Sequence, residues 1–269
     1  MSIVQAIKKG FVTVNRLMPV VGIFFVFNTL VSLISLPLTD PARAGQPGTM
    51  VVSVVSSIIF FLVFIFLQGG ALGMVKDRIK TGGSSLADFM DYGKKFYVRI
   101  LGLLLVYIIL AILIVFVLGL ISAGILLIGD NTFTRALVAV IVTAASLALI
   151  TFLIYPIYAL VADDIGPIDA LKRGFTVSKE HFGKTLGLFL LLLIISLVIS
   201  FIIGALVGIV TVPVGPGVSQ VVVAIVNAAV QSYIPLIMMV AFMGMYLAVS
   251  SFEGEGTAGP ATSEEGMQI

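Results

Sequence analysis

The sequence has 269 residues, of which 60% are hydrophobic and only 10% are charged. A soluble domain typically carries about 25% charged residues, so this composition excludes a soluble globular enzyme, a disordered chain and a nucleic-acid-binding module. Cysteine is absent, which also excludes a disulfide-stapled secreted scaffold. We therefore expect an all-α integral membrane protein that has no nucleic-acid partner.

Six apolar segments are long enough to cross a bilayer. A spanning helix needs about 20 residues, because the hydrocarbon core is about 30 Å thick and each residue rises about 1.5 Å. None of the six contains a charged residue or histidine, and none alternates between apolar and polar residues as a membrane β-strand does. Pro156 and Pro235 lie inside the fourth and sixth segments, where we expect kinks. The predicted spans are 17–38, 50–75, 100–128, 136–162, 186–212 and 218–250.

The first span also has features of a secretory signal peptide, because it follows a basic start and precedes Ala42-Arg43-Ala44. Its apolar run is longer than the roughly 15 residues of a signal-peptide core. Pro41 and Arg43 also crowd the site at which cleavage would occur. We therefore expect this segment to be retained as part of the fold.

Lysine and arginine are distributed unevenly between the two sides of the predicted membrane domain. Thirteen of the fifteen lie in the N-terminus, the 76–99 loop or the 163–185 loop, which share one side. The other side has only Arg43 and Arg135. The positive-inside rule therefore predicts a multi-pass protein of the cell (inner) membrane with both termini in the cytoplasm.

The sequence contains an internal repeat. Residues 6–11 (AIKKGF) reappear as residues 170–175 (ALKRGF), and residues 97–103 resemble residues 182–188. Residues 68–77 can likewise be aligned with residues 155–164. The simplest interpretation is three parallel repeats, each with a short amphipathic helix and two spans, at about 1–83, 84–165 and 166–251. Together they form one membrane domain, 1–251, followed by a disordered acidic tail, 252–269.

Each predicted short helix is amphipathic and basic. Such a helix beside a span is expected to lie among the lipid headgroups, where each lysine or arginine contributes about 1 kcal/mol of attraction to anionic lipid. The alternative is a set of solvated loops whose charge serves topology alone. The apolar faces comprise Ile3, Val4, Ile7, Phe11 and Val14 in the first helix, Leu86, Phe89, Met90, Gly93 and Tyr97 in the second, and Ile168, Leu171 and Phe175 in the third. The predicted anionic-lipid contacts are Lys8, Lys9, Lys94, Lys95, Lys172 and Arg173.

Two local signals place the starts of the second and third short helices. Ser85 with Asp88 three residues later forms a capping-box pattern, and Pro167 suits the first turn of a helix.

The segment ALKRGFTVSKEHFGKTLGLFLLLL, which starts at Ala170, resembles a set of uncharacterised six-helix prokaryotic membrane proteins. That set includes the membrane domain attached to some glycerophosphodiester phosphodiesterases. The resemblance implies the fold alone, because this chain has no phosphodiesterase domain, and it has Gly174 where the relatives often have serine.

The sequence offers little material for catalysis. His181 is the only histidine, and with no cysteine a zinc site would depend on one imidazole and carboxylates. Asp163, Asp164 and Asp169 could together hold a divalent cation, but such residues more often mark the exit of a helix from the membrane. Asp169 would also be stabilised by the N-terminus of the following helix. We expect no catalytic residue, no metal site and no cofactor.

Five amide side chains lie within the predicted spans, namely Asn28, Gln68, Gln220, Asn227 and Gln231. The last three fall within a narrow arc of one helix. Since three amides facing acyl chains would be left without hydrogen bonds, we expect this stripe to face other spans or a cavity inside the bundle. It is the candidate intramembrane polar site.

The function expected from these features is non-catalytic. We expect a scaffolding or assembly role in the membrane or cell envelope, with membrane lipids and other membrane proteins as partners. The alternative is a permease or a component that transports lipids or small solutes. The spans contain no charged residues, which disfavours an ion-coupled pump but not a passive path.

Overall fold

The computed structural model describes residues 1–38, 46–212 and 215–255, and the regular structure of these residues is entirely helical. Six of the helices are long and apolar enough to cross a membrane, namely α2 together with η1, α3, α4, α5, α7 and α8. This confirms the prediction of an all-α chain with six candidate spans. The elements are α1 (Ile3–Val14), α2 (Met18–Ser35), the 3-10 helix η1 (Leu36–Leu38), α3 (Pro47–Lys80), α4 (Leu86–Ile128), α5 (Thr132–Ala162), α6 (Pro167–Glu180), α7 (Phe182–Thr211) and α8 (Pro216–Glu255).

The predicted start signals are found where the sequence placed them. Ser85 and Asp88 form a reciprocal capping box at the start of α4, and Pro167 is the first residue of α6. Asp169 lies in the first turn of α6, where the positive end of the helix dipole favours it. A second capping box joins Ser2 and Gln5 at the start of α1. These caps satisfy backbone N–H groups that have no partner within the helix.

The second amphipathic segment is not a separate short helix. It forms the beginning of α4, which continues for 43 residues through Ile128. No proline interrupts residues 86–128, whereas Pro19 lies at the start of α2 and His181 ends α6 outside helical geometry. Because extending a helix is easier than starting one, α4 continues where the other two segments break.

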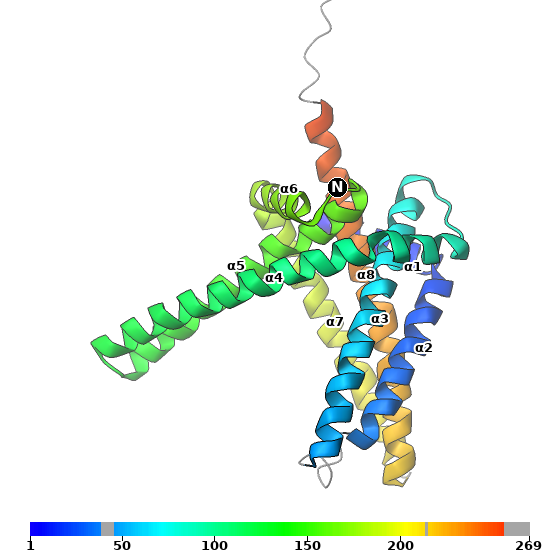
Figure 1. Ribbon diagram of the computed structural model, residues 1–269, viewed down its shortest axis with the longest axis horizontal. Coiled ribbons are helices and arrows are strands. Elements are labelled where there is room, and N and C mark those ends of the chain that lie inside the picture. The colour runs from blue at the N-terminus through cyan, green and yellow to red at the C-terminus, as the bar shows by residue number, and fades with distance from the viewer. Residues whose placement is uncertain (39–45, 213–214, 256–269) are drawn as a thin grey trace, which may run out of the picture.

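One end of the molecule gathers the short helices and the ends of three long ones (Figure 1). Here α1, α6 and the first turns of α4 surround the C-terminal halves of α3, α5 and α8, and we call this assembly the hub. Helix α1 packs chiefly on α8, α4 on α3, and α6 on α5. The hairpin of α4 and α5 projects away from the other four long helices (Figure 1).

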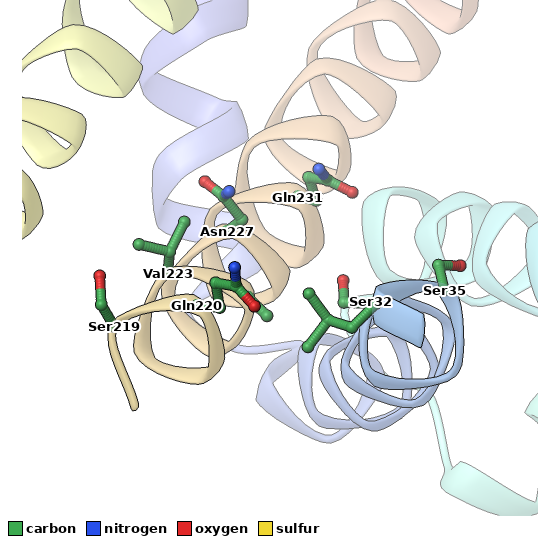
Figure 2. A pocket seen from close by; sticks show the side chains of 9 residues that line it. Ser32, Ser35, Ser219, Gln220, Val223, Asn227 and Gln231 are labelled. Atoms are coloured by element: carbon green, nitrogen blue, oxygen red, sulfur yellow. The ribbon is translucent and has the colours of Figure 1, made fainter. Parts of the chain in front are cut away.

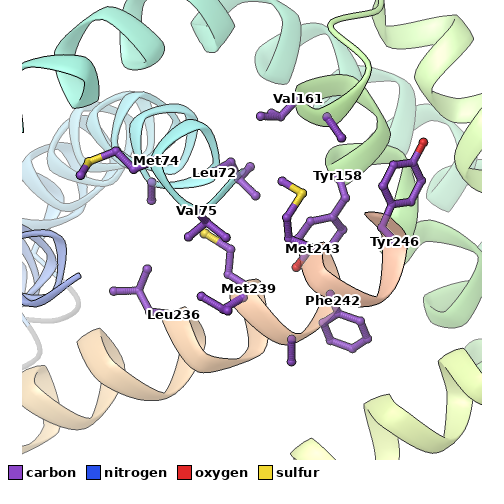
Figure 3. Packing of buried hydrophobic residues seen from close by; sticks show 14 of the residues in the cluster. Leu72, Met74, Val75, Tyr158, Val161, Leu236, Met239, Phe242, Met243 and Tyr246 are labelled. Atoms are coloured by element: carbon purple, nitrogen blue, oxygen red, sulfur yellow. The ribbon is translucent and has the colours of Figure 1, made fainter. Parts of the chain in front are cut away.

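The buried core of the protein lies in the hub. Leu72 and Val75 from α3, Tyr158 from α5, and Met239 and Met243 from α8 pack against one another there (Figure 3). Outside the hub the long helices expose large apolar side chains over most of their surface. That exposure suits a lipid environment, because acyl chains are as apolar as these side chains.

The apolar residues of the short helices are divided between the protein interior and the outer surface. Helix α1 buries Ala6, Gly10, Thr13 and Val14, whereas Val4 is 70% exposed. Helix α6 in the same way buries small residues and leaves Ile168 and Phe175 exposed. Small residues allow two helices to approach closely, so they take the protein-facing side, and the larger apolar residues face outward.

Helix α8 extends into the predicted acidic tail. It continues through residue 255, so residues 252–255 are helical. The existing helix is easily extended, even by polar residues. The rest of the predicted tail, 256–269, and the rejected cleavage site at 42–44 lie outside the described residues.

Candidate functional site

The end of α5 carries two carboxylates that hold the hub together. Asp164 accepts a hydrogen bond from Lys95 Nζ at 2.7 Å and another from Arg99 Nη1 at 2.6 Å. Arg99 Nη1 also donates to the backbone carbonyl of Asp164 at 3.1 Å. The hydrogen bond from Lys95, assisted by Arg99, lowers the pKa of Asp164 below its ordinary value. Asp164 has a φ of 58°, which aspartate tolerates better than most residues.

The neighbouring carboxylate, Asp163, has different partners. The Tyr246 hydroxyl donates to Asp163 Oδ2 at 2.5 Å, and Arg173 Nε lies 4.0 Å from the same oxygen. At the end of α3, Asp77 accepts a hydrogen bond from the Tyr92 hydroxyl of α4 in a comparable way. Each carboxylate thus joins the end of one long helix to a neighbouring segment of the hub.

This arrangement leaves the acidic residues in contact with cations and tyrosines instead of with one another. Among the residues that the structure describes, no group of three or more His, Asp or Glu side chains is placed to hold a metal ion. His181 is half-buried at the junction of α6 and α7, where its backbone carbonyl accepts a hydrogen bond from the Thr185 hydroxyl at 3.0 Å. The imidazole is therefore positioned at a helix junction.

Three of the predicted lipid-contacting lysines share one structural pattern. Lys8, Lys94 and Lys172 are exposed on the outer surface of the hub. Each is flanked, one helical turn before and one turn after, by an exposed large apolar side chain. We call these sets the outward stripes: Val4, Lys8 and Val12 on α1; Met90, Lys94 and Val98 on α4; and Ile168, Lys172 and Phe175 on α6.

The other three predicted lipid contacts lie in different surroundings. Lys95 forms the ion pair with Asp164 and lies 5.3 Å from the centre of the Phe96 ring. Lys9 and Arg173 line a pocket at the hub together with Lys80. The structure thus places three of the six basic residues between exposed apolar side chains, two at the pocket and one in an ion pair, a division that sequence periodicity did not make.

The three amides of the candidate polar site lie together along one groove. Gln220, Asn227 and Gln231 line a groove of about 360 Å³ between α8 and the end of α2 (Figure 2). Ser32 and Ser35 of α2 and Ser219 of α8 complete its polar lining. All three amide residues remain exposed, so the groove opens to the surface of the protein instead of being enclosed in the bundle.

The remaining two intramembrane amides do not join this groove. Asn28 Nδ2 donates to Ser232 Oγ at 2.9 Å, and Ser232 Oγ donates to the carbonyl of Ala228 at 2.5 Å. This pair joins α2 to α8, which is the usual packing role of small polar side chains between membrane helices. Gln68 is half-buried on α3.

Several contributors to the hub were not identified from the sequence. They are Tyr92 and Tyr246, which bind carboxylates, Lys80, which lines the hub pocket, and Lys76, whose Nζ donates to the carbonyl of Val161 at 3.0 Å. One sequence signal was available for Tyr92, because it precedes Gly93 just as Lys9 precedes Gly10. The others depend on contacts between helices that are distant in sequence.

Comparison with known proteins identifies one family. No curated protein and no solved structure matches the chain. The comparisons show no link to glycerophosphodiester phosphodiesterases, so that resemblance stays an expectation about the fold. The model of a domain of unknown function, DUF7847, matches residues 1–252, and the chain belongs to this family.

Proposed function

We propose that the chain is a non-catalytic protein of the cell membrane that contacts anionic lipid through the hub. Its role is in scaffolding or assembly at the membrane or envelope, and the hub and both termini lie on the cytoplasmic side. The observation that carries the proposal is the set of three outward stripes. Each presents a lysine between two exposed apolar side chains, which suits the boundary between headgroups and acyl chains.

We also propose that the membrane domain consists of three repeats. Support comes from three glycines, each of which lies where a short segment packs on the C-terminal half of a long helix. A Cβ on Gly10 would lie 3.0 Å from the carbonyl oxygen of Ile237 in α8, and one on Gly93 would lie 2.6 Å from the Phe66 ring of α3. A Cβ on Gly174 would overlap the backbone nitrogen of Pro156 in α5.

The lipid proposal is tested by replacing Lys8, Lys94 and Lys172 together with glutamine. Each lysine contributes about 1 kcal/mol of attraction, which is roughly fivefold in affinity, so the triple variant should lose anionic lipid severalfold. Native mass spectrometry of protein extracted from phosphatidylglycerol and phosphatidylcholine membranes measures the retained lipid. The thermal stability of the variant should match that of the unchanged protein, because all three side chains are exposed.

The matched control replaces the same three lysines with arginine, which keeps the charge and should keep the lipid. Equal retention of phosphatidylglycerol by the unchanged protein and the glutamine variant would contradict the proposal. In that case the charges would serve topology alone.

The polar groove supports a second candidate, a passive path for a lipid or small solute between α2 and α8. Replacing Asn227 with leucine distinguishes this path from simple helix packing. On the transport hypothesis, solute release from proteoliposomes should be lost while the protein stays folded. On the packing hypothesis, the variant and the unchanged protein should show the same solute release. The melting temperature should change only slightly, because an interhelical hydrogen bond contributes about 0.6 kcal/mol on average.

A further inference from the structure

The hub contains a pocket of about 500 Å³ that the outward stripes do not touch. Its lining comes from α1, α3, α6, α8 and the end of α5. Among the residues whose side chains the structure describes, three basic ones, Lys9, Lys80 and Arg173, line it together with one carboxylate, Asp163. Gly244 of α8 also contributes to the lining. This described lining has an excess of positive charge.

The hub has three similar helix contacts, each made at a glycine, and the pocket lies at the one that differs from the other two. On α4, the Tyr92 side chain meets Asp77, which follows Gly69 by about two turns of α3. On α6, Arg173 meets Asp163, which follows Pro156 by two turns of α5. In both cases the residue that precedes the packed glycine meets a carboxylate at the end of the partner helix.

The third contact lacks that carboxylate. Lys9 precedes Gly10 on α1, and Gly10 packs on Ile237 of α8. Two turns beyond Ile237 the helix carries Gly244, and a Cβ built there would lie 3.8 Å from Lys9 Cδ. Within the described part of the chain, no carboxylate lies within ion-pair distance of Lys9. The pocket is lined by Gly244, which stands at the position where the other two contacts have an aspartate.

We propose that this pocket binds a phosphate-bearing anion, whose charge takes the place that an aspartate holds at the other two contacts. Lysine and arginine are the side chains that most often bind phosphate, through charge-assisted hydrogen bonds. Asp163 is held by Tyr246 and faces Arg173, so it leaves Lys9 and Lys80 to the ligand. The ligand is the phosphate of a lipid headgroup or of a soluble compound. The inference does not depend on the outward stripes.

Gly244 provides the sharpest test. Replacing it with aspartate supplies the missing carboxylate beside Lys9, and the added Cβ fits because its nearest neighbour, Met1 Cε, would lie 3.4 Å away. Asparagine at the same position is the matched control, since it has nearly the same shape and no charge. We expect inorganic phosphate to raise the melting temperature of detergent-purified full-length protein, relative to sodium chloride at equal ionic strength.

The phosphate-induced rise should persist in Gly244→Asn and in Lys8→Gln, whose lysine is exposed outside the pocket. It should be lost in Lys9→Gln and Gly244→Asp, with apparent affinity at least about tenfold weaker, because one variant removes a cation that pairs with the anion and the other places a carboxylate that repels it. The Gly244→Asp variant should itself remain folded, which its melting temperature without phosphate reports.

A second arm of the experiment identifies the source of the phosphate. Native mass spectrometry with phosphatidic acid and phosphatidylcholine measures lipid retention by the same variants. Retention of phosphatidic acid that is lost in Gly244→Asp but kept in Gly244→Asn assigns the pocket to a lipid headgroup, whereas a response to inorganic phosphate alone assigns it to a soluble ligand. If the aspartate and asparagine variants bind both probes equally, the proposal is wrong, even where the lysine-stripe variant has lost lipid.

Discussion

At the scale of single residues, Asp164 shows how one carboxylate stabilises the hub. It receives hydrogen bonds from Lys95 and Arg99, both on α4, and so ties the end of α5 to α4. Its pKa lies below the ordinary value of 3.8, chiefly because of Lys95. A carboxylate with a lowered pKa in the folded state stabilises the protein above the pKa of the unfolded state, and this stabilisation is lost as the pH falls through the folded pKa.

We therefore expect Asp164→Asn to reduce stability at neutral pH and to flatten the loss of stability under acid conditions. Because the Asp164 side chain is 44% exposed, solvent screens the pair, and the expected cost is only about 1 kcal/mol. Asparagine tolerates the positive φ, so backbone strain does not add to this cost. Thermal unfolding in detergent between pH 7 and pH 3 measures it. Asp91→Asn is the control, and an acid response identical in all three proteins would contradict the role of Asp164.

At the scale of elements, the contact of α6 with α5 depends on a glycine. A Cβ on Gly174 would overlap the backbone of Pro156, which cannot move as a flexible side chain would. We expect Gly174→Ala to force α6 away from α5 and to cost about 1–3 kcal/mol, as overpacking of a close contact typically does. The melting temperature in detergent measures this loss.

Gly183 provides the matched control for Gly174. It lies at the start of α7, and a Cβ there would meet nothing within 4 Å. Because alanine favours a helix over glycine by up to about 1 kcal/mol, Gly183→Ala should be neutral or stabilising. If Gly174→Ala is as stable as Gly183→Ala, close packing of α6 on α5 does not hold the hub together.

The elements also show which parts of the structure were predictable from the sequence. The six long helices and the cap at Ser85 follow from local patterns, so they were predicted correctly. The sequence did not show which residues of α1 and α6 face protein, because a large apolar residue is equally stable against lipid and against protein, and periodicity alone cannot distinguish the two. The pocket lining by Lys9, Lys80 and Arg173 was not predictable either, because it needs three helices that are distant in sequence to meet.

At the scale of the whole molecule, the segments that carry most of the lysines and arginines come together at one end, in the hub. The short helices α1 and α6, the loop after α3 and the start of α4 share this end (Figure 1), whereas the turn between α4 and α5 lies at the far tip of the projecting hairpin. Thirteen of the fifteen lysines and arginines belong to the segments that the sequence assigns to one side. The positive-inside rule therefore predicts that the hub faces the cytoplasm.

This sidedness can be tested directly, because the chain has no cysteine and single cysteines can be labelled without background. Gly83 and Glu180 are exposed at the hub, and Thr132 is exposed at the tip of the α4–α5 hairpin. In intact cells, a membrane-impermeant thiol reagent should label Thr132→Cys and should leave Gly83→Cys and Glu180→Cys unlabelled. After permeabilisation all three should react, which controls for the accessibility of each thiol. Labelling of the two hub positions in intact cells would reverse the orientation, and it would place the basic pocket and the outward stripes against the outer leaflet.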